Sequence, residues 1–218
     1  MQTRAGQSIE DASMDMIDRE AGPHGYDPME WPVVRRIIHS TADFDYIGAN
    51  RVIFHPDAIR SGMGALVAGC HIITDVNGIP GLLNKRNLAE FGNGVTCRIS
   101  EERVASLARE RDSTRARVAM RESAQEMEGG VVVVGNAPTA LLEVMDMIRK
   151  EAARPALVVG VPVGFVQAAE SKAELETIQV PYITNRGRKG GSPVAAAIIN
   201  ALFKLARSSP GVSGAVSH

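Results

Sequence analysis

One histidine of this chain stands among residue types that could support acid catalysis. His39 shares the last turn of a predicted helix with Arg35 and Arg36, and it precedes two hydroxyl side chains and two carboxylates in the run R-I-I-H-S-T-A-D-F-D-Y (36–46). An unperturbed imidazole has a pKa of about 6.5, so it can donate and accept a proton near neutral pH. A structural histidine explains the same pattern, because a helix C-terminus stabilises imidazolium in any protein. The segment by itself leaves both interpretations open.

A glycine-rich basic segment offers a place for an anion. Arg186, Arg188 and Lys189 alternate with three glycines between residues 186 and 191, directly before a predicted helix. Glycine lets backbone N–H groups turn toward an anion, and a helix N-terminus adds partial positive charge. The segment therefore predicts binding of a carboxylate or a phosphate, with a solvent-exposed basic turn as the alternative.

The common nucleotide and metal motifs are broken or missing. The Walker pattern requires a Gly-Lys pair, which this chain lacks, and the Gly-x-Gly pairs at 62–64 and 92–94 lead to Val67 and Cys97 where a dinucleotide fingerprint requires a third glycine. The five histidines are scattered and form no H-x-x-x-H or Cys/His cluster. No G-x-S-x-G elbow marks a hydrolase nucleophile. We therefore expect neither a cofactor nor a metal.

Composition and charge fit an ordinary globular protein. The chain has 218 residues, of which 44% are hydrophobic and 22% charged. Its net charge of −1 gives no overall field that would attract nucleic acid or an anionic membrane. There is no apolar run of about 18 residues and no signal-peptide pattern. We expect a cytoplasmic protein that binds neither nucleic acid nor membrane, with Cys70 and Cys97 as buried thiols.

Short β-rich runs alternate with helical stretches along the chain. The continuous run Val131–Val134 is typical of a central strand that is buried on both faces. The other predicted strands are 51–55, 70–76, 95–99, 156–161 and 182–184. Helices are predicted from Ser8 through Ile17 and at 29–39, 56–68, 101–127 with a break near 112–114, 139–150, 169–178 and 192–206. This alternation predicts a single-domain α/β fold, a doubly wound, Rossmann-like, mainly parallel sheet with helices on both faces.

Three loops of such a fold are the expected places for a ligand. In an open parallel sheet, ligands bind beyond the carboxyl ends of the strands. The loops at 135–139, 160–172 and 184–192 follow predicted strands and are rich in glycine or charge. We place the domain at 8–207 and expect flexible tails at 1–7 and 208–218.

Four segments resemble the precorrin-8X methylmutase family, including its cobalt-precorrin-8 members, in the family's own order. They are R-I-I-H-S-T-A-D-F-D-Y (36–46), G-N-A-P-T-A-L (135–141), G-V-P-V-G-F-V-Q-A-A-E-S-K (160–172) and G-R-K-G-G-S-P-V-A-A-A (187–197). The resemblance extends from about Ser8 to Ala206. It implies a homodimeric isomerase of cobalamin biosynthesis that moves one methyl group from C-11 to C-12 of the tetrapyrrole, without a cofactor, to give hydrogenobyrinate or cobyrinate.

The resemblance also implies roles for individual residues. His39 matches the family's catalytic histidine, which is expected to protonate, or to donate a hydrogen bond to, a pyrrole nitrogen beside the migrating methyl group. The residues expected to bind the acetate and propionate groups or to line the same cavity are Ser13, Thr41, Asp43, Arg115, Lys172, Arg188, Lys189, Gly190 and Gly191. The metal-free and cobalt substrates stay open, with the runs 41–46 and 198–202 favouring cobalt. A non-catalytic corrinoid carrier and a nucleotide-dependent enzyme are the alternatives.

Overall fold

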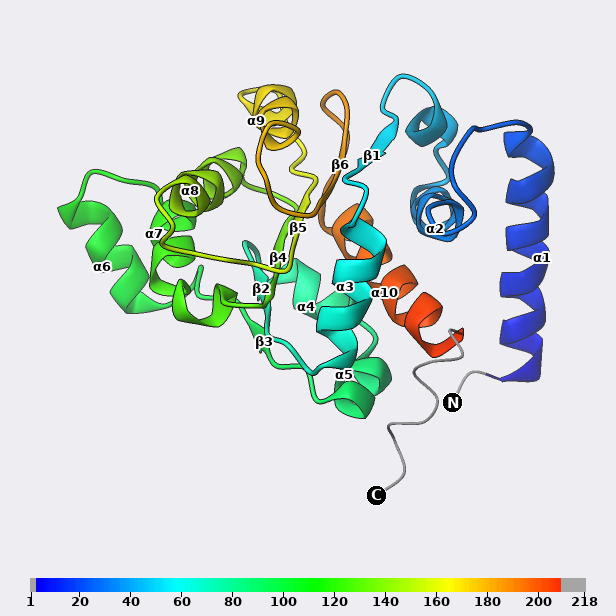
Figure 1. Cartoon of the computed structure of the whole chain (residues 1–218), viewed down its shortest axis with the longest axis horizontal. Helices are drawn as coiled ribbons and strands as arrows, with labels where there is room; N and C mark the ends of the chain where they lie inside the picture. Colours follow the sequence, from blue (N-terminus) through cyan, green and yellow to red (C-terminus); the bar gives the residue numbers. More distant parts are fainter. Residues whose placement is uncertain (1–2, 209–218) are drawn as a thin grey trace.

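A six-stranded sheet runs through the molecule in the order β1-β6-β5-β4-β2-β3 (Figure 1). The computed structural model describes residues 3–208 of the chain. The strands are β1 (Val52–Phe54), β2 (Ile72–Thr74), β3 (Val95–Thr96), β4 (Val131–Val134), β5 (Leu157–Gly160) and β6 (Tyr182–Asn185). All neighbouring strands are parallel except β1, which pairs antiparallel with β6. Each of the six strands lies in or overlaps a strand segment that the sequence predicts.

Helices cover both faces of this sheet. They are α1 (Arg4–Ala21), α2 (Trp31–Thr41), α3 (Ala58–Val67), α4 (Gly78–Leu82), α5 (Lys85–Phe91), α6 (Glu102–Glu110), α7 (Arg115–Glu122), α8 (Pro138–Arg149), α9 (Ala168–Leu175) and α10 (Ser192–Ser208). Two short 3₁₀ helices, η1 (Phe44–Ile47) and η2 (Gln125–Met127), complete the elements. The predicted α/β fold with helices on both faces is confirmed.

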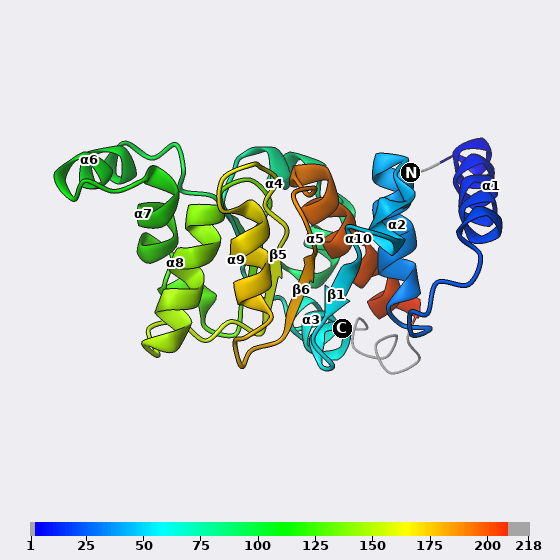
Figure 2. The ribbon, with the colours of Figure 1, turned by 90° about the horizontal axis from the view of Figure 1, so that it is seen from above.

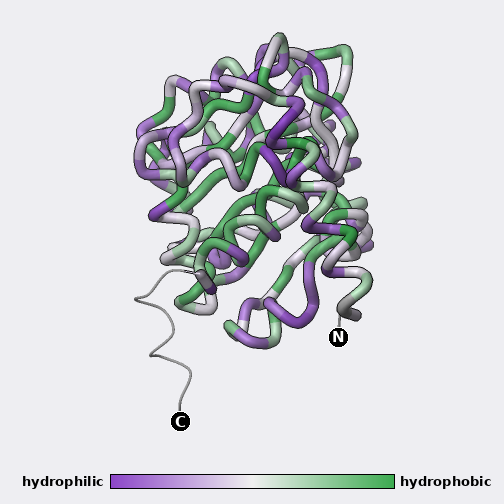
Figure 3. Tube along the Cα trace, turned by 90° about the vertical axis from the view of Figure 1, so that its right-hand side faces the viewer, coloured by the Kyte–Doolittle hydropathy of each residue, from purple (hydrophilic) through white to green (hydrophobic). Residues whose placement is uncertain are grey.

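The central strand β4 shows why the sheet is buried on both sides. Val131 and Val133 pack into one apolar cluster with α3 and α10, whereas Val132 and Val134 pack into a second cluster with α7 and α8. Successive side chains of a strand point to opposite faces, so a run of four valines contributes two side chains to the core on each face of the sheet. All four are 0% exposed. Figure 3 accordingly shows apolar segments through the middle of the molecule.

Two further helices stack outward from α10. Helix α2 packs against α10, and α1 packs against α2 at the edge of the molecule (Figures 1 and 2). The carboxylate of Asp18 in α1 accepts hydrogen bonds from Trp31 Nε1 at 2.8 Å and from Arg35 Nη1 at 2.6 Å. Met14 and Ile17 provide the apolar part of this contact. His39 is thereby placed in the last turn of a helix that lies between α1 and α10.

Several predicted boundaries differ from the structure. The predicted loose tail 1–7 is wrong from Arg4 onward, because Thr3 caps α1 by accepting a hydrogen bond from the Gly6 N–H. The predicted helix 101–127 divides near the expected break, where Thr114 caps α7. Helices α4 and α5 were not predicted. Of the predicted tail 208–218, residue 208 ends α10 and residues 209–218 lie outside the described residues.

The two cysteines are half-buried, so the prediction of buried thiols is wrong in degree. Burial raises the pKa of Cys70 to about 11. The first glycine pair has a packing role: a Cβ at Gly62 in α3 would lie 2.7 Å from Leu157. Gly62 therefore allows α3 to pack closely against the sheet.

Candidate functional site

The strand order reverses between β2 and β4, which is where a doubly wound sheet usually binds its ligand. The two loops that diverge at this point are tied together by one carboxylate. Asp75, directly after β2, accepts the backbone N–H groups of Gly135 at 2.9 Å, Asn136 at 2.8 Å and Ala137 at 2.6 Å. These N–H groups directly precede α8.

Asp75 therefore occupies the position that a bound anion would take. It is 1% exposed, and burial raises its pKa while the three N–H donors lower it. The N–H groups before α8 already donate to a carboxylate of the chain. They therefore have no free hydrogen to donate to a nucleotide phosphate. This geometry weighs against the nucleotide-dependent alternative.

The predicted anion loop has its own internal partners. Lys189 donates from Nζ to Asp43 Oδ2 and to Asp45 Oδ2, both at 2.6 Å, which raises the pKa of Lys189 and lowers that of Asp43. Gly191 donates its N–H to Val161 O at 2.9 Å. At Gly190 a Cβ would lie 2.1 Å from Val161 O, so this glycine allows a close approach of two loops. The loop fastens β6 to the end of α2.

Of the loop cations, Arg186 and Arg188 are exposed, and Arg188 lies beside an aromatic ring. Its guanidinium lies 5.5 Å from the ring centroid of Phe165, which is 83% exposed. Val163 and Val166 in the same loop after β5 are exposed as well. This apolar and basic surface at the carboxyl edge remains open to a ligand or a partner.

Lys172 contacts the backbone of the glycine-rich basic loop from the interior of the protein and does not reach solvent. It is 1% exposed, and its ammonium donates to Lys189 O at 2.5 Å and to Asn185 Oδ1 at 3.4 Å. Burial lowers its pKa to about 8. The structure thus places Lys172 against the backbone of the loop, where it holds Lys189 in position.

This buried lysine predicts a pH-dependent stability. An unfolded lysine has a pKa of 10.5, so between pH 8 and 10.5 the unfolded chain binds more protons and stability rises with pH. Relative to Lys172→Met, the wild type should gain about 2 kcal/mol of unfolding free energy over that window. Urea unfolding at both ends of the window measures the difference, with Lys85→Met as the control at an exposed lysine. An equal difference at both pH values would contradict the assignment.

His39 is half-buried and faces charges on three helices. Burial lowers its pKa below the ordinary 6.5, Arg36 and Lys204 lower it further, and Glu10 of α1 raises it. Thr41, two residues on, donates its hydroxyl to Ile37 O at 2.9 Å within α2.

The remaining predicted site residues outside the loop after β6 lie in three places. Asp43 caps η1 just after α2 and contacts Lys189, so His39, Thr41, Asp43 and Lys189 belong to one region. Ser13 lies on α1, and its hydroxyl donates to Ile9 O at 2.9 Å within that helix. Arg115 begins α7, which lies at the opposite end of the molecule from α1 and α2 in Figures 1 and 2. One chain does not bring Arg115 to His39.

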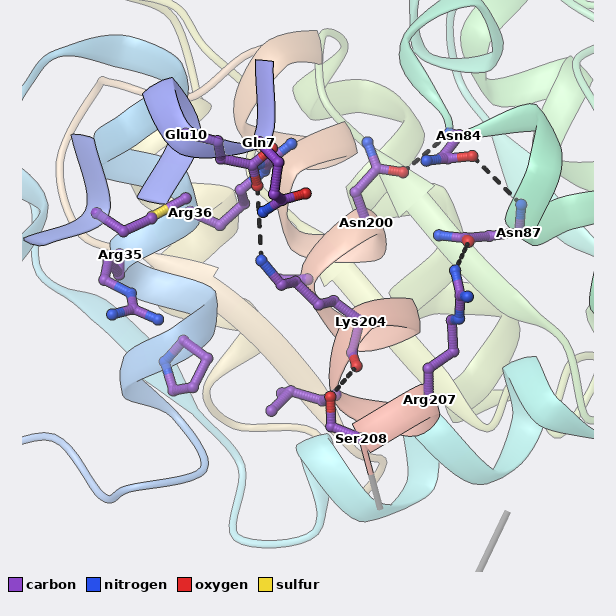
Figure 4. A pocket seen from close by; sticks show the side chains of 14 residues that line it. Gln7, Glu10, Arg35, Arg36, Asn84, Asn87, Asn200, Lys204, Arg207 and Ser208 are labelled. Carbon is purple, nitrogen blue, oxygen red and sulfur yellow. Dashed lines mark hydrogen bonds and ion pairs between the residues drawn. The ribbon is translucent and has the colours of Figure 1, made fainter. Parts of the chain in front are cut away.

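A polar cavity of about 690 Å³ lies next to His39, between α1, α2, α5 and α10 (Figure 4). Its lining comprises Gln7, Glu10, Met14, Pro32, Arg35, Arg36, Asn84, Asn87, Asn200, Ala201, Lys204, Leu205, Arg207 and Ser208. None of the predicted site residues is among them, but His39 follows Arg35 and Arg36 by one turn of the same helix. Four cations and one carboxylate give the lining a net positive charge.

Glu10 links these helices on one side of the cavity. Its carboxylate lies 2.8 Å from Arg36 Nη1 and 3.5 Å from Lys204 Nζ, so this one carboxylate forms ion pairs with cations on both α2 and α10 (Figure 4). Sequence reasoning placed Arg35 and Arg36 beside His39 but did not assign them to a site. It missed Lys204 and Arg207 altogether, because α10 carries no motif at these positions.

Two kinds of feature are absent from the described part of the chain. Within residues 3–208, no helix is long and apolar enough to cross a membrane. Over the same residues, no three His, Cys, Asp or Glu side chains gather in a way that could hold a metal ion.

Comparison with known proteins identifies the family. The family model described as precorrin-8X methylmutase matches residues 8–205. The cobalt-precorrin-8 methylmutase of Leptospira interrogans is 47% identical, over 93% of this chain and 95% of the relative, and that of Priestia megaterium is 44% identical, over 93% and 89%. The solved precorrin-8X methyl mutase of Thermus thermophilus superposes with a TM-score of 0.86 at 43% identity, over 97% of this chain and 99% of the other. The chain therefore belongs to the precorrin-8X methylmutase family, whose members are isomerases of cobalamin biosynthesis.

Proposed function

We propose that this chain moves a methyl group from C-11 to C-12 of precorrin-8X or cobalt-precorrin-8 in the cytoplasm, giving hydrogenobyrinate or cobyrinate, with His39 as the general acid. The observation that carries the proposal is the position of His39, half-buried at the end of α2 beside a cavity lined by four cations. The names of the relatives support the same substrates.

The cavity suits a ligand with many carboxylates. The macrocycle bears acetate and propionate groups, and arginine and lysine are the side chains that bind carboxylates most strongly. Arg36 and Lys204 both contact one carboxylate, that of Glu10, so a carboxylate of the substrate can join or replace it. Arg188 at the carboxyl edge is exposed and can bind a further one.

Substrate binding would also prepare His39 for its role. In the free protein, burial and the charge of Arg36 favour the neutral imidazole. A substrate carboxylate beside Arg36 offsets that charge and raises the pKa, so the imidazolium becomes the favoured form. Its proton, donated to a pyrrole nitrogen, places positive charge on the ring and weakens the bond to the migrating methyl group. The proton returns to His39 after the shift, and no atoms are gained or lost.

We also propose that the protein is a homodimer. Arg115 lies at the far end of the chain from His39, so it can contribute to a site with His39 only if a second copy brings it there. Exposed apolar side chains on the outer face of α1, Ile9 at 70% and Met16 at 53%, offer contact area for that copy. Sedimentation of the full chain measures the oligomeric state.

Conversion of the substrate tests the function directly. The protein is mixed with metal-free and cobalt-loaded substrate in parallel, without any cofactor, and visible spectra are recorded over time. Moving the methyl group changes which ring carbon is saturated, so conversion changes the conjugation and the colour progressively. A spectral change that is complete on mixing and never progresses would support the corrinoid carrier and contradict the mutase.

The dependence of kcat/KM on pH tests the environment of His39. This constant reports the ionisation of the free enzyme, and His39 works as an acid only when protonated. Because its pKa is lowered, kcat/KM is expected to fall as pH rises, with a midpoint below 6.5. Glu10→Gln removes the carboxylate that raises this pKa, so the midpoint should move to still lower pH.

The control for that variant is Glu20→Gln, which makes the same change of charge at an exposed position of α1. Arg36 and Lys204 are the other charges that face His39, and they remain in place in both variants. A midpoint above 6.5, or one that Glu10→Gln leaves unmoved, would contradict the assignment of His39 as the titrating acid.

A further inference from the structure

The half of the cavity farthest from Glu10 is built almost entirely from hydrogen-bond donors. It is formed by the start of α5 and the C-terminal half of α10, with Asn84, Asn87, Lys204 and Arg207 around an open space (Figure 4). Glu10 is the one carboxylate among the lining residues, and it lies at the border of this half, next to Arg36 and 3.5 Å from Lys204. We call this half the α5–α10 subsite.

The amide oxygens of this subsite are already used by the protein. Asn84 caps α5, its Oδ1 accepting the backbone N–H groups of Arg86 at 3.0 Å and Asn87 at 3.3 Å. Asn87 Oδ1 accepts from Arg207 Nη1 at 3.3 Å. These partners fix which end of each amide is the oxygen, because a backbone N–H and a guanidinium can only donate.

The amide nitrogens remain for a ligand. Neither Asn84 Nδ2 nor Asn87 Nδ2 has an acceptor within the described residues. Asn87 is only 6% exposed, so its donor meets nothing but the cavity. Asn200 holds the arrangement in place by accepting the Asn84 N–H at 2.9 Å and by donating to Leu82 O at 3.0 Å.

Two cations complete the set of donors. The Lys204 ammonium lies 3.5 Å from Glu10, and Arg207 lies 3.6 Å from Glu90 and donates to Asn87, so within residues 3–208 neither cation is held by a close, buried acid. Two amide N–H₂ groups, an ammonium and a guanidinium around one space match an ionised carboxylate, which only accepts. A carboxamide or an ester would leave donors unmatched or would itself present donors to them.

We propose that the α5–α10 subsite binds one ionised acetate or propionate side chain of the macrocycle and so selects substrates whose carboxylate is free at that position. The proposal rests on the proposed function, because it assumes that the tetrapyrrole occupies this cavity. It adds a second anchoring point for the substrate, on α5 and α10.

Substitution of Asn84 gives the sharpest test. Asn84→Asp keeps an oxygen that can cap α5, since aspartate caps as well as asparagine, but it replaces the Nδ2 donor by a negative oxygen. We expect KM to rise about tenfold or more with kcat little changed, because a hydrogen bond to a charged group is lost and like charges meet. Asn84→Ser, which caps without the amide donor, should raise KM about threefold.

Lys85→Met is the matched control. It makes the same change of net charge one residue later, at an exposed position outside the cavity lining, and should leave KM within about twofold of the wild type. The same proteins are titrated with a porphyrin that carries acetate and propionate groups and with its methyl ester. The carboxylate form should bind the wild type more tightly than the ester, and Asn84→Asp should remove most of that preference.

The possible outcomes separate this proposal from the proposed function. If the wild type converts substrate and Asn84→Asp keeps the wild-type KM and the wild-type preference for the carboxylate porphyrin, the subsite is wrong and the mutase stands. If nothing is converted but Asn84→Asp still abolishes the preference, the subsite stands and the mutase is wrong. Equal KM values for the aspartate and serine variants, both raised in proportion to lost stability, would show a purely structural role.

Discussion

His39→Ala is expected to lower kcat by about 10²–10⁴-fold while KM changes little, since general acid help of this kind contributes that much to a rate. The side chain is half-buried in the last turn of α2, one turn beyond the lining residues Arg35 and Arg36, whereas the cations that hold the carboxylates lie on other residues. Removing the imidazole therefore removes the acid and leaves the binding groups. Visible spectra of the conversion, with both substrate forms, measure the effect.

The control for this variant is His71→Ala. His71 is exposed just before β2, at the amino end of the parallel strands, and packs beside Gly94. It should convert substrate at the wild-type rate. If His39→Ala retains a kcat within about fivefold of the wild type, general acid catalysis by this residue is excluded, since even the low end of the expected range is larger.

Asp75→Ala should be among the most destabilising single substitutions in the chain. It leaves three N–H groups at the start of α8 without their acceptor, and hydrogen bonds to a charged group are worth about 1.5–3 kcal/mol each. Relief of the buried carboxylate's desolvation offsets part of this loss. We expect the free energy of unfolding to fall by about 3–5 kcal/mol, a large share of the total for a domain of this size.

Urea unfolding measures this loss, and Asn77→Ala in the same loop is the comparison. Asn77 is exposed and makes one side-chain hydrogen bond, to Ser100 Oγ at 2.7 Å, so its removal should cost about 1 kcal/mol or less. Phosphate or sulfate should restore part of the stability of Asp75→Ala by entering the vacated N–H site. A cost below about 1 kcal/mol for Asp75→Ala would show that the three contacts do not hold the loops together.

The sheet was predictable because its signals are local. The valine run of β4 and the β-branched segments of the other strands show their type within a few residues, and the break before α7 is marked by Thr114 and its polar neighbours. Helix α5 was missed although it carries local signals, Asn84 as its N-cap and Gly92 as its C-cap, whereas α4 has none. Helix α4 contains Pro80 and is five residues long, and its only strong support is tertiary, the burial of Ile79 in the core.

The direction of β1 is another tertiary result. Val52–Phe54 has the composition of a strand, but nothing within it tells a parallel from an antiparallel neighbour. Pairing with β6 is antiparallel because the chain reaches this edge from α2 and η1, without a crossover from a parallel strand.

For the site, the sequence by itself determined the candidate acid and the family pattern around it. His39 and its basic neighbours are adjacent in the chain, so their chemistry could be read without a fold. The tertiary structure decided which cations are available to a ligand. Lys189 is paired with carboxylates 146 and 144 positions away, and Lys172 is buried against a backbone carbonyl, whereas Lys204 and Arg207 open into the cavity. A charge is free or neutralised according to what folds against it, and those partners are distant in sequence.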